Sequence, residues 1–248
     1  MSDIEKKYED FISTVSHELR TPLTSIRGFS QTMLASWDKL DDESKKKFIK
    51  IIEEQSNRLI HLVENMLSVT KLQASGNNFV YNELCIKNPI EQIISIVKTQ
   101  YPSHKFEFQY CENLPPIFVD KDKFQQIMTN LIENSAKYSI EAGVTQILTS
   151  INGNNVVIKV LNNGIGIDQA DYDKIFKKFA RIDNPLTRRV QGSGLGLYIT
   201  KSLVEKMGGE ISVNSVELND GSGLSQITFT LLLPVKSLEE QARLKCNQ

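Results

Sequence analysis

The chain has 248 residues, of which 40% are hydrophobic and 24% charged, a composition that suits one ordinary domain and a smaller one. A net charge of −1 without a long Lys/Arg run argues against nonspecific nucleic-acid binding. No apolar run approaches the roughly 20 residues that cross a bilayer, and the N-terminus lacks the apolar core of a signal peptide. Three scattered cysteines fit a reducing cytosol, with neither a disulfide framework nor a zinc site.

Residues 2–36 form the first predicted element, one long helix that Pro22 should bend. At about 100° per residue its apolar side chains fall on one arc, and His17 points away from that arc. The imidazole then faces water, beside the Glu18 carboxylate and one turn below the Thr21 hydroxyl. Two interpretations remain open: a solvated surface histidine, or an exposed nucleophile whose second proton passes to the neighbouring carboxylate.

A second long helix is expected over residues 43–74, after a short turn at 37–42. Its apolar stripe is too broad for one partner helix to bury, so two copies of the hairpin are expected to form a four-helix bundle in a homodimer. Ser75-Gly76-Asn77-Asn78 then marks a domain boundary. The expected division is a hairpin at 1–75, a linker at 76–78, a second domain at 79–236 and a polar tail at 237–248.

Strand and helix patterns mix in the second domain. Strands are expected at residues 79–85, 105–111, 117–119, 144–149, 156–161, 210–216 and 225–233. Helices are expected at residues 89–101, 121–139 and 194–207. This order predicts an α+β fold in which one layer of helices covers a mixed sheet.

The predicted helix at 121–139 has an apolar side for the sheet and a polar side. The polar side carries Asn130, Glu133, Asn134, Lys137 and Tyr138. Taken alone, such a stripe is more often a solvated face. Uncharged asparagines at i and i+4, with a lysine three residues later, also suit a hydrated magnesium ion and phosphate oxygens.

Two glycine-rich segments follow. The first, N-N-G-I-G-I at residues 162–167, comes directly after a strand, where a hairpin or bulge needs the same glycines. The second, G-S-G-L-G-L at residues 192–197, leads into a helix whose free N–H groups and dipole favour a phosphate. The chain has no G-K-[ST] ending of a Walker loop, and the position of the glycines disfavours a dinucleotide-binding βαβ unit.

In chain order, five segments resemble the motifs of two-component sensor histidine kinases, over residues 8–234. S-H-E-L-R-T-P-L resembles the H box, N-L-I-E-N-S-A-K-Y-S the N box and I-F-K-K-F-A-R the F box, while the two glycine segments resemble the glycine boxes. The resemblance implies a dimeric phosphotransfer hairpin joined to an α/β sandwich of the Bergerat (GHKL) ATP-binding type. It implies ATP-dependent autophosphorylation of His17 and transfer to an aspartate of a response-regulator receiver domain, with phosphatase activity toward that regulator.

The resemblance also gives roles to single residues. His17 is the implied phosphoacceptor, Glu18 polarises its ring, and Thr21 orients the water that dephosphorylates the regulator. Asn130 takes the place of a Glu that activates water in ATP-hydrolysing relatives, which fits transfer over hydrolysis, and Asn134 is the implied magnesium ligand. The implied nucleotide-binding residues are Asn130, Asn134, Lys137, Tyr138, Asn162, Gly164, Gly166, Ile167, Phe179, Arg188, Arg189, Gly192, Gly194, Leu195, Gly196 and Leu197.

Two parts of this assignment stay open. Residues 180–191 would form an ATP lid, in which Arg188 or Arg189 either reaches the γ-phosphate or is an ordinary loop charge. At Asn162 the family usually has Asp, which accepts a hydrogen bond from the adenine amino group. A neutral amide accepts about half as strongly, so weakened ATP binding is expected, and the amide can also turn and donate to a guanine carbonyl.

The same departure permits a different interpretation, a degenerate kinase that acts as a dimeric signalling scaffold. A GHKL ATPase of the chaperone or repair kind is a third, but it has no use for the His17 hairpin. The expected partners are a response regulator, a second copy of the chain and an upstream sensor domain or protein, with no nucleic acid. The expected location is cytoplasmic, as the core of a longer membrane-bound sensor or as a soluble kinase.

Overall fold

The computed structural model describes residues 3–73, 79–139, 143–180, 182, 192–236 and 240, with the side chains of residues 3–11 and 73 left out. The chain divides into two compact units, residues 1–70 and 71–248. The predicted linker at residues 76–78 lies outside the described residues. Within the described ranges, no helix has a stretch that is both long enough and apolar enough to span a membrane.

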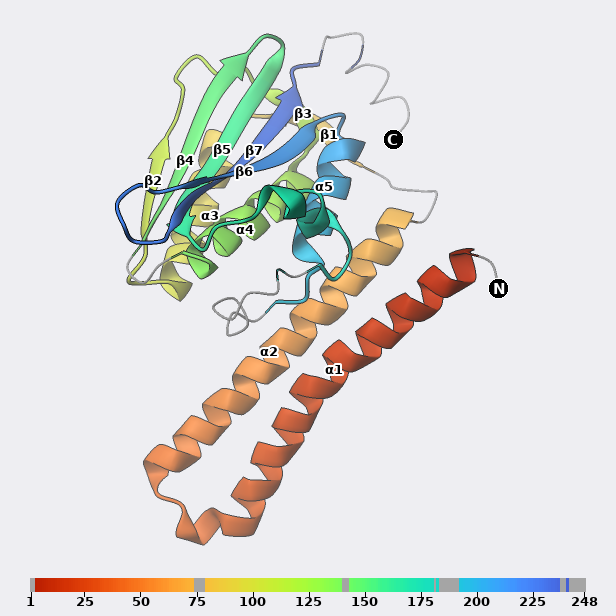
Figure 1. Ribbon diagram of the computed structural model, residues 1–248, viewed down its shortest axis with the longest axis vertical. Helices are drawn as coiled ribbons and strands as arrows, with labels where there is room; N and C mark the ends of the chain where they lie inside the picture. Colours follow the sequence, from red (N-terminus) through yellow and green to blue (C-terminus); the bar gives the residue numbers. More distant parts are fainter. Residues whose placement is uncertain are drawn as a thin grey trace. The chain divides into compact units, whose positions relative to one another are not determined.

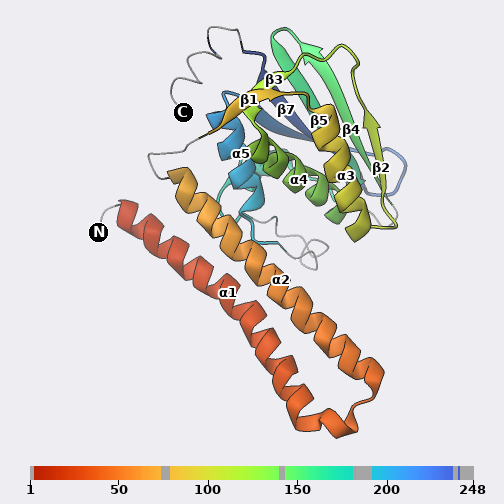
Figure 2. The same ribbon diagram turned by 180° about the vertical axis from the view of Figure 1, so that it is seen from behind.

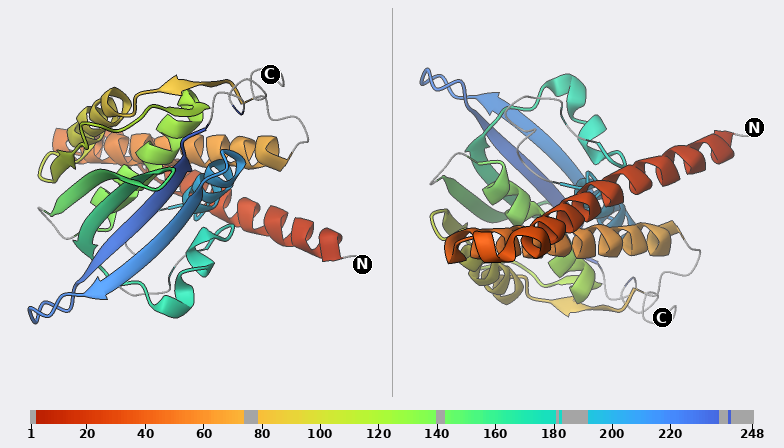
Figure 3. Two further views of the ribbon diagram at one scale, coloured as in Figure 1. Left: turned by 90° about the horizontal axis from the view of Figure 1, so that it is seen from above. Right: turned by 90° about the horizontal axis from the view of Figure 1, so that it is seen from below.

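The first unit is a hairpin of two long helices (Figures 1 and 3). Helix α1 (Asp3–Ser36) continues through Pro22 and is followed by a 3₁₀ turn, η1 (Trp37–Lys39). Helix α2 (Asp42–Gln73) begins where the Asp41 carboxylate accepts a hydrogen bond of 2.7 Å from a backbone N–H of the first turn. A short acidic side chain in that place satisfies a free N–H of a helix start.

Little of the hairpin's apolar surface is buried within one chain. The rings of Phe29 and Phe48 meet across the two helices with centroids 5.2 Å apart. The buried side chains of the described part are Pro22, Met33, Leu62 and Val69. Large apolar side chains that remain exposed are Ile12, Leu23, Leu34, Trp37, Ile49, Ile60, Val63 and Leu67.

The second unit is a sheet with helices on one face (Figures 1 and 2). Its five strands lie in the order β2 (Lys105–Gln109), β4 (Val144–Asn152), β5 (Asn155–Gly164), β7 (Ser225–Pro234) and β6 (Glu210–Glu217). The β2–β4 pair is parallel and the other pairs are antiparallel. Strands β6 and β7 form a hairpin whose turn projects past the rest of the sheet (Figure 3).

The helical layer consists of α3 (Lys87–Gln100), α4 (Lys121–Lys137) and α5 (Gly196–Lys206), with α4 in contact with both of the others. A small antiparallel pair, β1 (Tyr81–Leu84) and β3 (Ile117–Asp120), leads into α4. Asp120 caps that helix, because its carboxylate accepts from the Lys123 N–H at 3.0 Å and also from the Val80 N–H at 2.9 Å.

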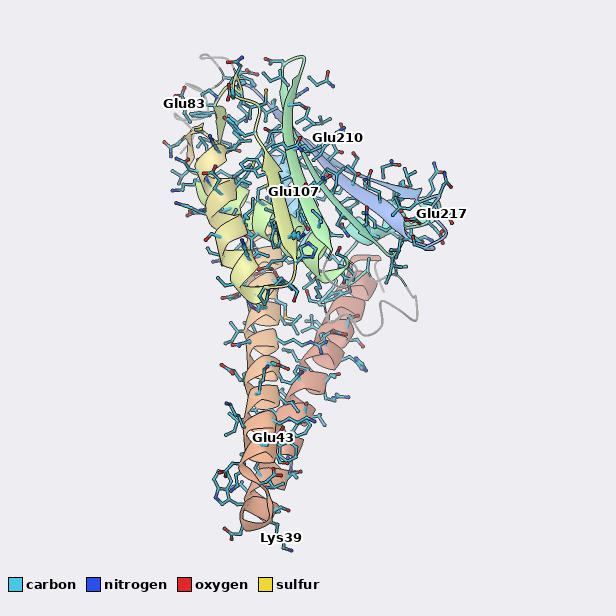
Figure 4. All side chains as sticks on the ribbon, turned by 90° about the vertical axis from the view of Figure 1, so that its left-hand side faces the viewer. Lys39, Glu43, Glu83, Glu107, Glu210 and Glu217 are labelled. Carbon is cyan, nitrogen blue, oxygen red and sulfur yellow. The ribbon has the colours of Figure 1, made fainter. Side chains whose placement is uncertain are left out.

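Buried and exposed side chains alternate along the strands, as expected for a sheet that is covered on one face. Along β7 the side chains at 225, 227, 229, 231 and 233 are buried, while those between them are partly or fully exposed. On the open face, Glu107 of β2 accepts a hydrogen bond of 2.8 Å from Gln146 of β4 (Figure 4). The core lies between the sheet and α4, whose fully buried side chains are Phe124, Ile127, Met128, Leu131 and Ile132.

These observations confirm the predicted α+β architecture, with one helical layer on a mixed sheet. Every predicted helix and strand is present, with ends displaced by at most three residues. Two short 3₁₀ turns, η2 (Gln169–Asp171) and η3 (Lys174–Phe176), are not among the predicted elements.

Candidate functional site

One histidine of the hairpin, His17, is exposed. His17 lies on α1, and the hydroxyl of Thr21 donates to the His17 carbonyl oxygen at 3.3 Å. The neighbouring Glu18 is largely buried, and its Oε2 accepts a hydrogen bond of 3.4 Å from Arg58 Nη2 of α2. Since 22% and 23% of the two charged side chains are exposed, this pair is partly shielded from water. The imidazole therefore faces solvent, and the carboxylate of the next residue in the chain is held from the opposite helix.

In the second unit, the polar side of α4 is fixed by α5. Asn130 Nδ2 donates to the buried Thr200 Oγ1 at 2.8 Å, and Asn134 Nδ2 donates to Asn130 Oδ1 at 3.3 Å. The two amides are therefore ordered in series. In this arrangement the atom that Asn134 offers to a cation is its carbonyl oxygen, as a magnesium site requires.

Close approach of α5 to α4 depends on Gly196. A Cβ at this position would overlap the Asn130 side chain, so any larger residue would push the start of α5 away from the two asparagines. The preceding Leu195 has a fully buried side chain, and its N–H donates to Ser193 Oγ at 3.3 Å. Leu195 thus anchors the start of the helix in the core.

The end of α4 lies beside the second glycine segment. Lys137 Nζ stands 5.6 Å from the centre of the Tyr138 ring, and a Cβ at Gly192 would lie 3.3 Å from that nitrogen. Gly194 lies against the backbone of Phe179, which itself has a left-handed φ of 59°. The glycine segment before α5, the side chain of Lys137 and the F-box residue Phe179 therefore lie at the same end of α4.

The first glycine segment joins this group through the sheet. Gly164 forms a β-bridge with Ser139, whose hydroxyl donates to the Asn163 carbonyl at 2.9 Å. Ile167 donates its N–H to Ser215 Oγ at 3.1 Å, and Gly166 lies against the Ser225 side chain. The turn after β5 is therefore fixed on both sides, at the end of α4 and at β6–β7.

Asn162 precedes that turn and is unusual. Its side chain is 4% exposed, and its Nδ2 has no hydrogen-bond partner among the described residues. Buried amide groups in proteins are nearly always paired, and an unpaired one costs about 1–3 kcal/mol. Asn162 Nδ2 is thus a buried donor in this part of the chain that no described residue satisfies.

The electrostatic surroundings add a neutral tyrosine to the polar side of α4. Burial raises the pKa of Tyr101, and the nearby charge of Glu133 raises it further. At neutral pH the ring therefore keeps its proton. Within the described part of the chain, no group of three or more His, Cys, Asp or Glu side chains could hold a metal ion. A magnesium ion here would need water and phosphate oxygens besides Asn134, which fits its preference for retained waters.

Most of the predicted site residues thus come together in the second unit. His17, Glu18 and Thr21 belong to the first unit. Arg188 and Arg189 lie outside the described residues. Contacts around α4 and the start of α5 join Asn130, Asn134, Lys137, Tyr138, Phe179, Gly192, Gly194 and Gly196, and Leu195 and Leu197 flank Gly196 in the sequence. Gly164 lies against the Tyr138 backbone and beside Asn162, while Gly166 and Ile167 lie against β7 and β6.

Comparison with known proteins matches this arrangement. Residues 7–75 match the His Kinase A (phospho-acceptor) domain family, and residues 119–237 match the family of histidine kinase-, DNA gyrase B- and HSP90-like ATPases. The chain is 32% identical over 245 residues to the sensor histidine kinase WalK of Bacillus subtilis, covering 96% of this chain and 38% of WalK. The chain belongs to the two-component sensor histidine kinases.

A second curated relative gives the same extent of overlap. The histidine kinase is 31% identical over 225 residues to the signal transduction histidine-protein kinase ArlS of Staphylococcus aureus, covering 90% of this chain and 49% of ArlS. The chain therefore spans less than half the length of these curated relatives.

Solved structures share the fold of the histidine kinase. Histidine kinase AdeS of Acinetobacter baumannii superposes with a TM-score of 0.66 at 24% identity, over 89% of this chain and 98% of AdeS. Full-length ShkA, solved in complex with AMPPNP, gives 0.65 at 25% identity, over 92% of this chain and 46% of ShkA. ThkA, solved in complex with the response regulator TrrA, gives a TM-score of 0.71 at 24% identity, over 92% of this chain and 61% of the ThkA chain.

Sequence patterns missed two residues of the histidine kinase that position others. Arg58 reaches Glu18 from 40 residues away, and nothing in the local pattern of α2 marks it. Thr200 orders Asn130, and its one signal was a hydroxyl on the otherwise apolar side of the helix at 194–207.

Proposed function

We propose that the chain is an ATP-dependent protein-histidine kinase that phosphorylates its own His17 and passes the phosphoryl group to an aspartate of a response regulator. The observation that carries the proposal is the exposed imidazole of His17, beside a Glu18 that Arg58 holds. A histidine kept for packing would be buried, and one kept for solubility needs no fixed carboxylate. Exposure and a neighbouring base are what a nucleophilic imidazole needs.

The proposed reaction uses ATP as the substrate. One ring nitrogen of neutral His17 forms the N–P bond as the bond from the γ-phosphorus to the β–γ bridging oxygen breaks. ADP leaves with that oxygen, and Glu18 accepts the proton of the other ring nitrogen. Phosphoryl transfer of this kind depends on position and charge neutralisation more than on covalent help from the protein.

The second unit supplies the position and the charge. Asn134, Lys137 and the N–H groups at the start of α5 would hold the phosphates, and a magnesium ion on Asn134 would neutralise part of their charge. Asn130 bonds Thr200 and Asn134, so it orders the site and has no carboxylate to activate water. This favours transfer to histidine over hydrolysis.

The partners follow from the same family. We propose a homodimer through the exposed apolar side of the hairpin, a response regulator as phosphoryl acceptor, and a cytoplasmic location. ShkA with AMPPNP and ThkA with a response regulator give examples of a similar fold with each class of partner. We further propose that Thr21 takes part in removing phosphate from that regulator, next to His17 on the same face of α1.

Incubation with γ-labelled ATP and magnesium tests the kinase activity. We expect acid-labile, base-stable label on the wild-type chain and none on His17→Gln. His61→Gln is the matched control, because His61 is a second exposed histidine of the hairpin, on α2. Label that survives in His17→Gln, or that resists acid, would overturn the proposal, and a chain that binds ATP without any label would indicate the scaffold.

A further inference from the structure

The unpaired amide of Asn162 points to the kind of base that the nucleotide site accepts. Among the described residues, Asn162 Nδ2 is the one buried side-chain nitrogen or oxygen atom without a hydrogen-bond partner. Other buried polar groups nearby are paired: Thr145, which faces Asn162 across β4–β5, bonds both His104 Nε2 and Ser135 Oγ at 2.8 Å. The unpaired donor is therefore a local exception, and native proteins rarely keep one without a use.

No described residue holds the Nδ2 end of the Asn162 amide by a hydrogen bond. The nearest glycine, Gly164, has no side chain to block it, since a Cβ there would lie 3.2 Å from Nδ2. The two ends of an amide have nearly the same size, so a half-turn about the last bond exchanges its donor and its acceptor. No hydrogen bond from Nδ2 to the described residues opposes that half-turn.

We propose that Asn162 makes the nucleotide site tolerant of both 6-aminopurines and 6-oxopurines. This inference rests on the proposed function, since it concerns the base of the nucleotide that the kinase uses. With Oδ1 toward the base, the amide accepts from an amino group, as on adenine. With Nδ2 toward the base, it donates to a carbonyl, as on guanine or hypoxanthine. A carboxylate at the same place has two acceptors and no donor, so it rejects the 6-oxopurines.

Binding of three nucleotides measures this tolerance. Dissociation constants for ATP, GTP and ITP are obtained by calorimetry on the full chain, with His17→Gln in every sample so that no phosphoryl transfer occurs. We expect GTP and ITP to bind within about tenfold of ATP, the range that one hydrogen bond spans. ITP lacks the 2-amino group of guanine, so agreement between GTP and ITP assigns the effect to the 6-position.

A charge variant sharpens the test. In Asn162→Asp we expect ATP to bind more tightly and both 6-oxopurines more weakly. The carboxylate oxygen and the base carbonyl oxygen are both acceptors, and they would face each other in a buried place without a donor. We therefore expect the GTP/ATP ratio of dissociation constants to rise by about a hundredfold. Asn163→Asp is the control: the same substitution one residue on, where side chains point to the other face of β5.

The outcomes separate this inference from the proposed function. If the chain with Asn162 binds ATP but neither GTP nor ITP, the inference alone is overturned. It is also overturned if Asn162→Asp leaves the GTP/ATP ratio of dissociation constants unchanged. A chain that binds none of the three nucleotides overturns the proposed function as well. The ratios measured with Asn162 unchanged need no substitution at that residue, so the inference remains testable if Asn162→Asp fails to fold.

Discussion

The Glu18 carboxylate is held by one residue that no motif contains. Arg58 reaches it from α2 with a hydrogen bond of 3.4 Å, and both side chains are about four-fifths buried. A free glutamate samples several rotamers, and most of them direct its carboxylate away from the neighbouring residue. We therefore expect Arg58 to act, through Glu18, as a positioning residue for the proposed phosphoacceptor.

Removing the Arg58 charge should slow phosphorylation without weakening nucleotide binding. A partly exposed ion pair contributes roughly 1 kcal/mol, which corresponds to about a fivefold change in rate. We expect Arg58→Met to lower kcat for autophosphorylation about fivefold at an unchanged KM for ATP, and Arg58→Lys to restore part of it. Lys45→Met is the control, because Lys45 of α2 pairs with the fully exposed Asp42. Equal losses in both Met variants, or a rise in KM, would contradict the assignment.

Three elements of the second unit are tied together by one buried imidazole. His104, at the start of β2, shares a hydrogen bond of 2.8 Å with Thr145 of β4, which is bonded in turn to Ser135 of α4. All three are buried. Burial lowers the pKa of His104 below its ordinary value of 6.5, because a charged ring loses its hydration there.

This burial predicts a loss of stability in acid. Between the lowered pKa of the folded chain and about 6.5, the unfolded chain binds more protons, so the free energy of unfolding falls as the pH falls, by at most about 1.4 kcal/mol per pH unit. We expect calorimetric melting temperatures between pH 7.5 and pH 5 to fall more steeply for the wild type than for His104→Gln. His61→Gln, which changes an exposed histidine, should keep the wild-type slope. Parallel curves for the wild type and His104→Gln would refute the prediction.

Helices and strands were predictable where apolar side chains recur at a regular spacing. The apolar periods of α1, α2 and α4 and the alternation of β7 locate those elements to within a few residues. The turns η2 and η3 were missed because three residues are too few to show a period. Asn162 was singled out by its departure from the family pattern, but its lack of a partner depends on neighbours from several strands. Spacing in the sequence does not contain that information.

At the scale of the whole molecule, the hairpin has an apolar side that one chain leaves uncovered. On α1 the exposed Ile12, Leu23 and Leu34 are spaced by eleven residues, within about 20° of three full turns. On α2 the same spacing joins Ile49 to Ile60. Each helix therefore carries exposed apolar side chains along one side, and such side chains on two packed helices are typical of a surface that another protein covers.

A second copy of the hairpin is the partner we propose, and one substitution per chain tests it. In a two-fold dimer each substitution occurs twice, so Ile60→Glu places two carboxylates in an apolar interface. We expect the wild-type chain to sediment as a dimer at micromolar concentration and Ile60→Glu to raise the dimer dissociation constant at least about a hundredfold.

Ile96→Glu is the control, because Ile96 is 60% exposed on α3 of the other unit and Ile60 is 54% exposed. A dimer that tolerates Ile60→Glu as well as Ile96→Glu would place the contact elsewhere, and a monomeric wild type would exclude the four-helix bundle. The pair of variants separates an interface from a general effect of added charge, since both replace an equally exposed isoleucine on a helix.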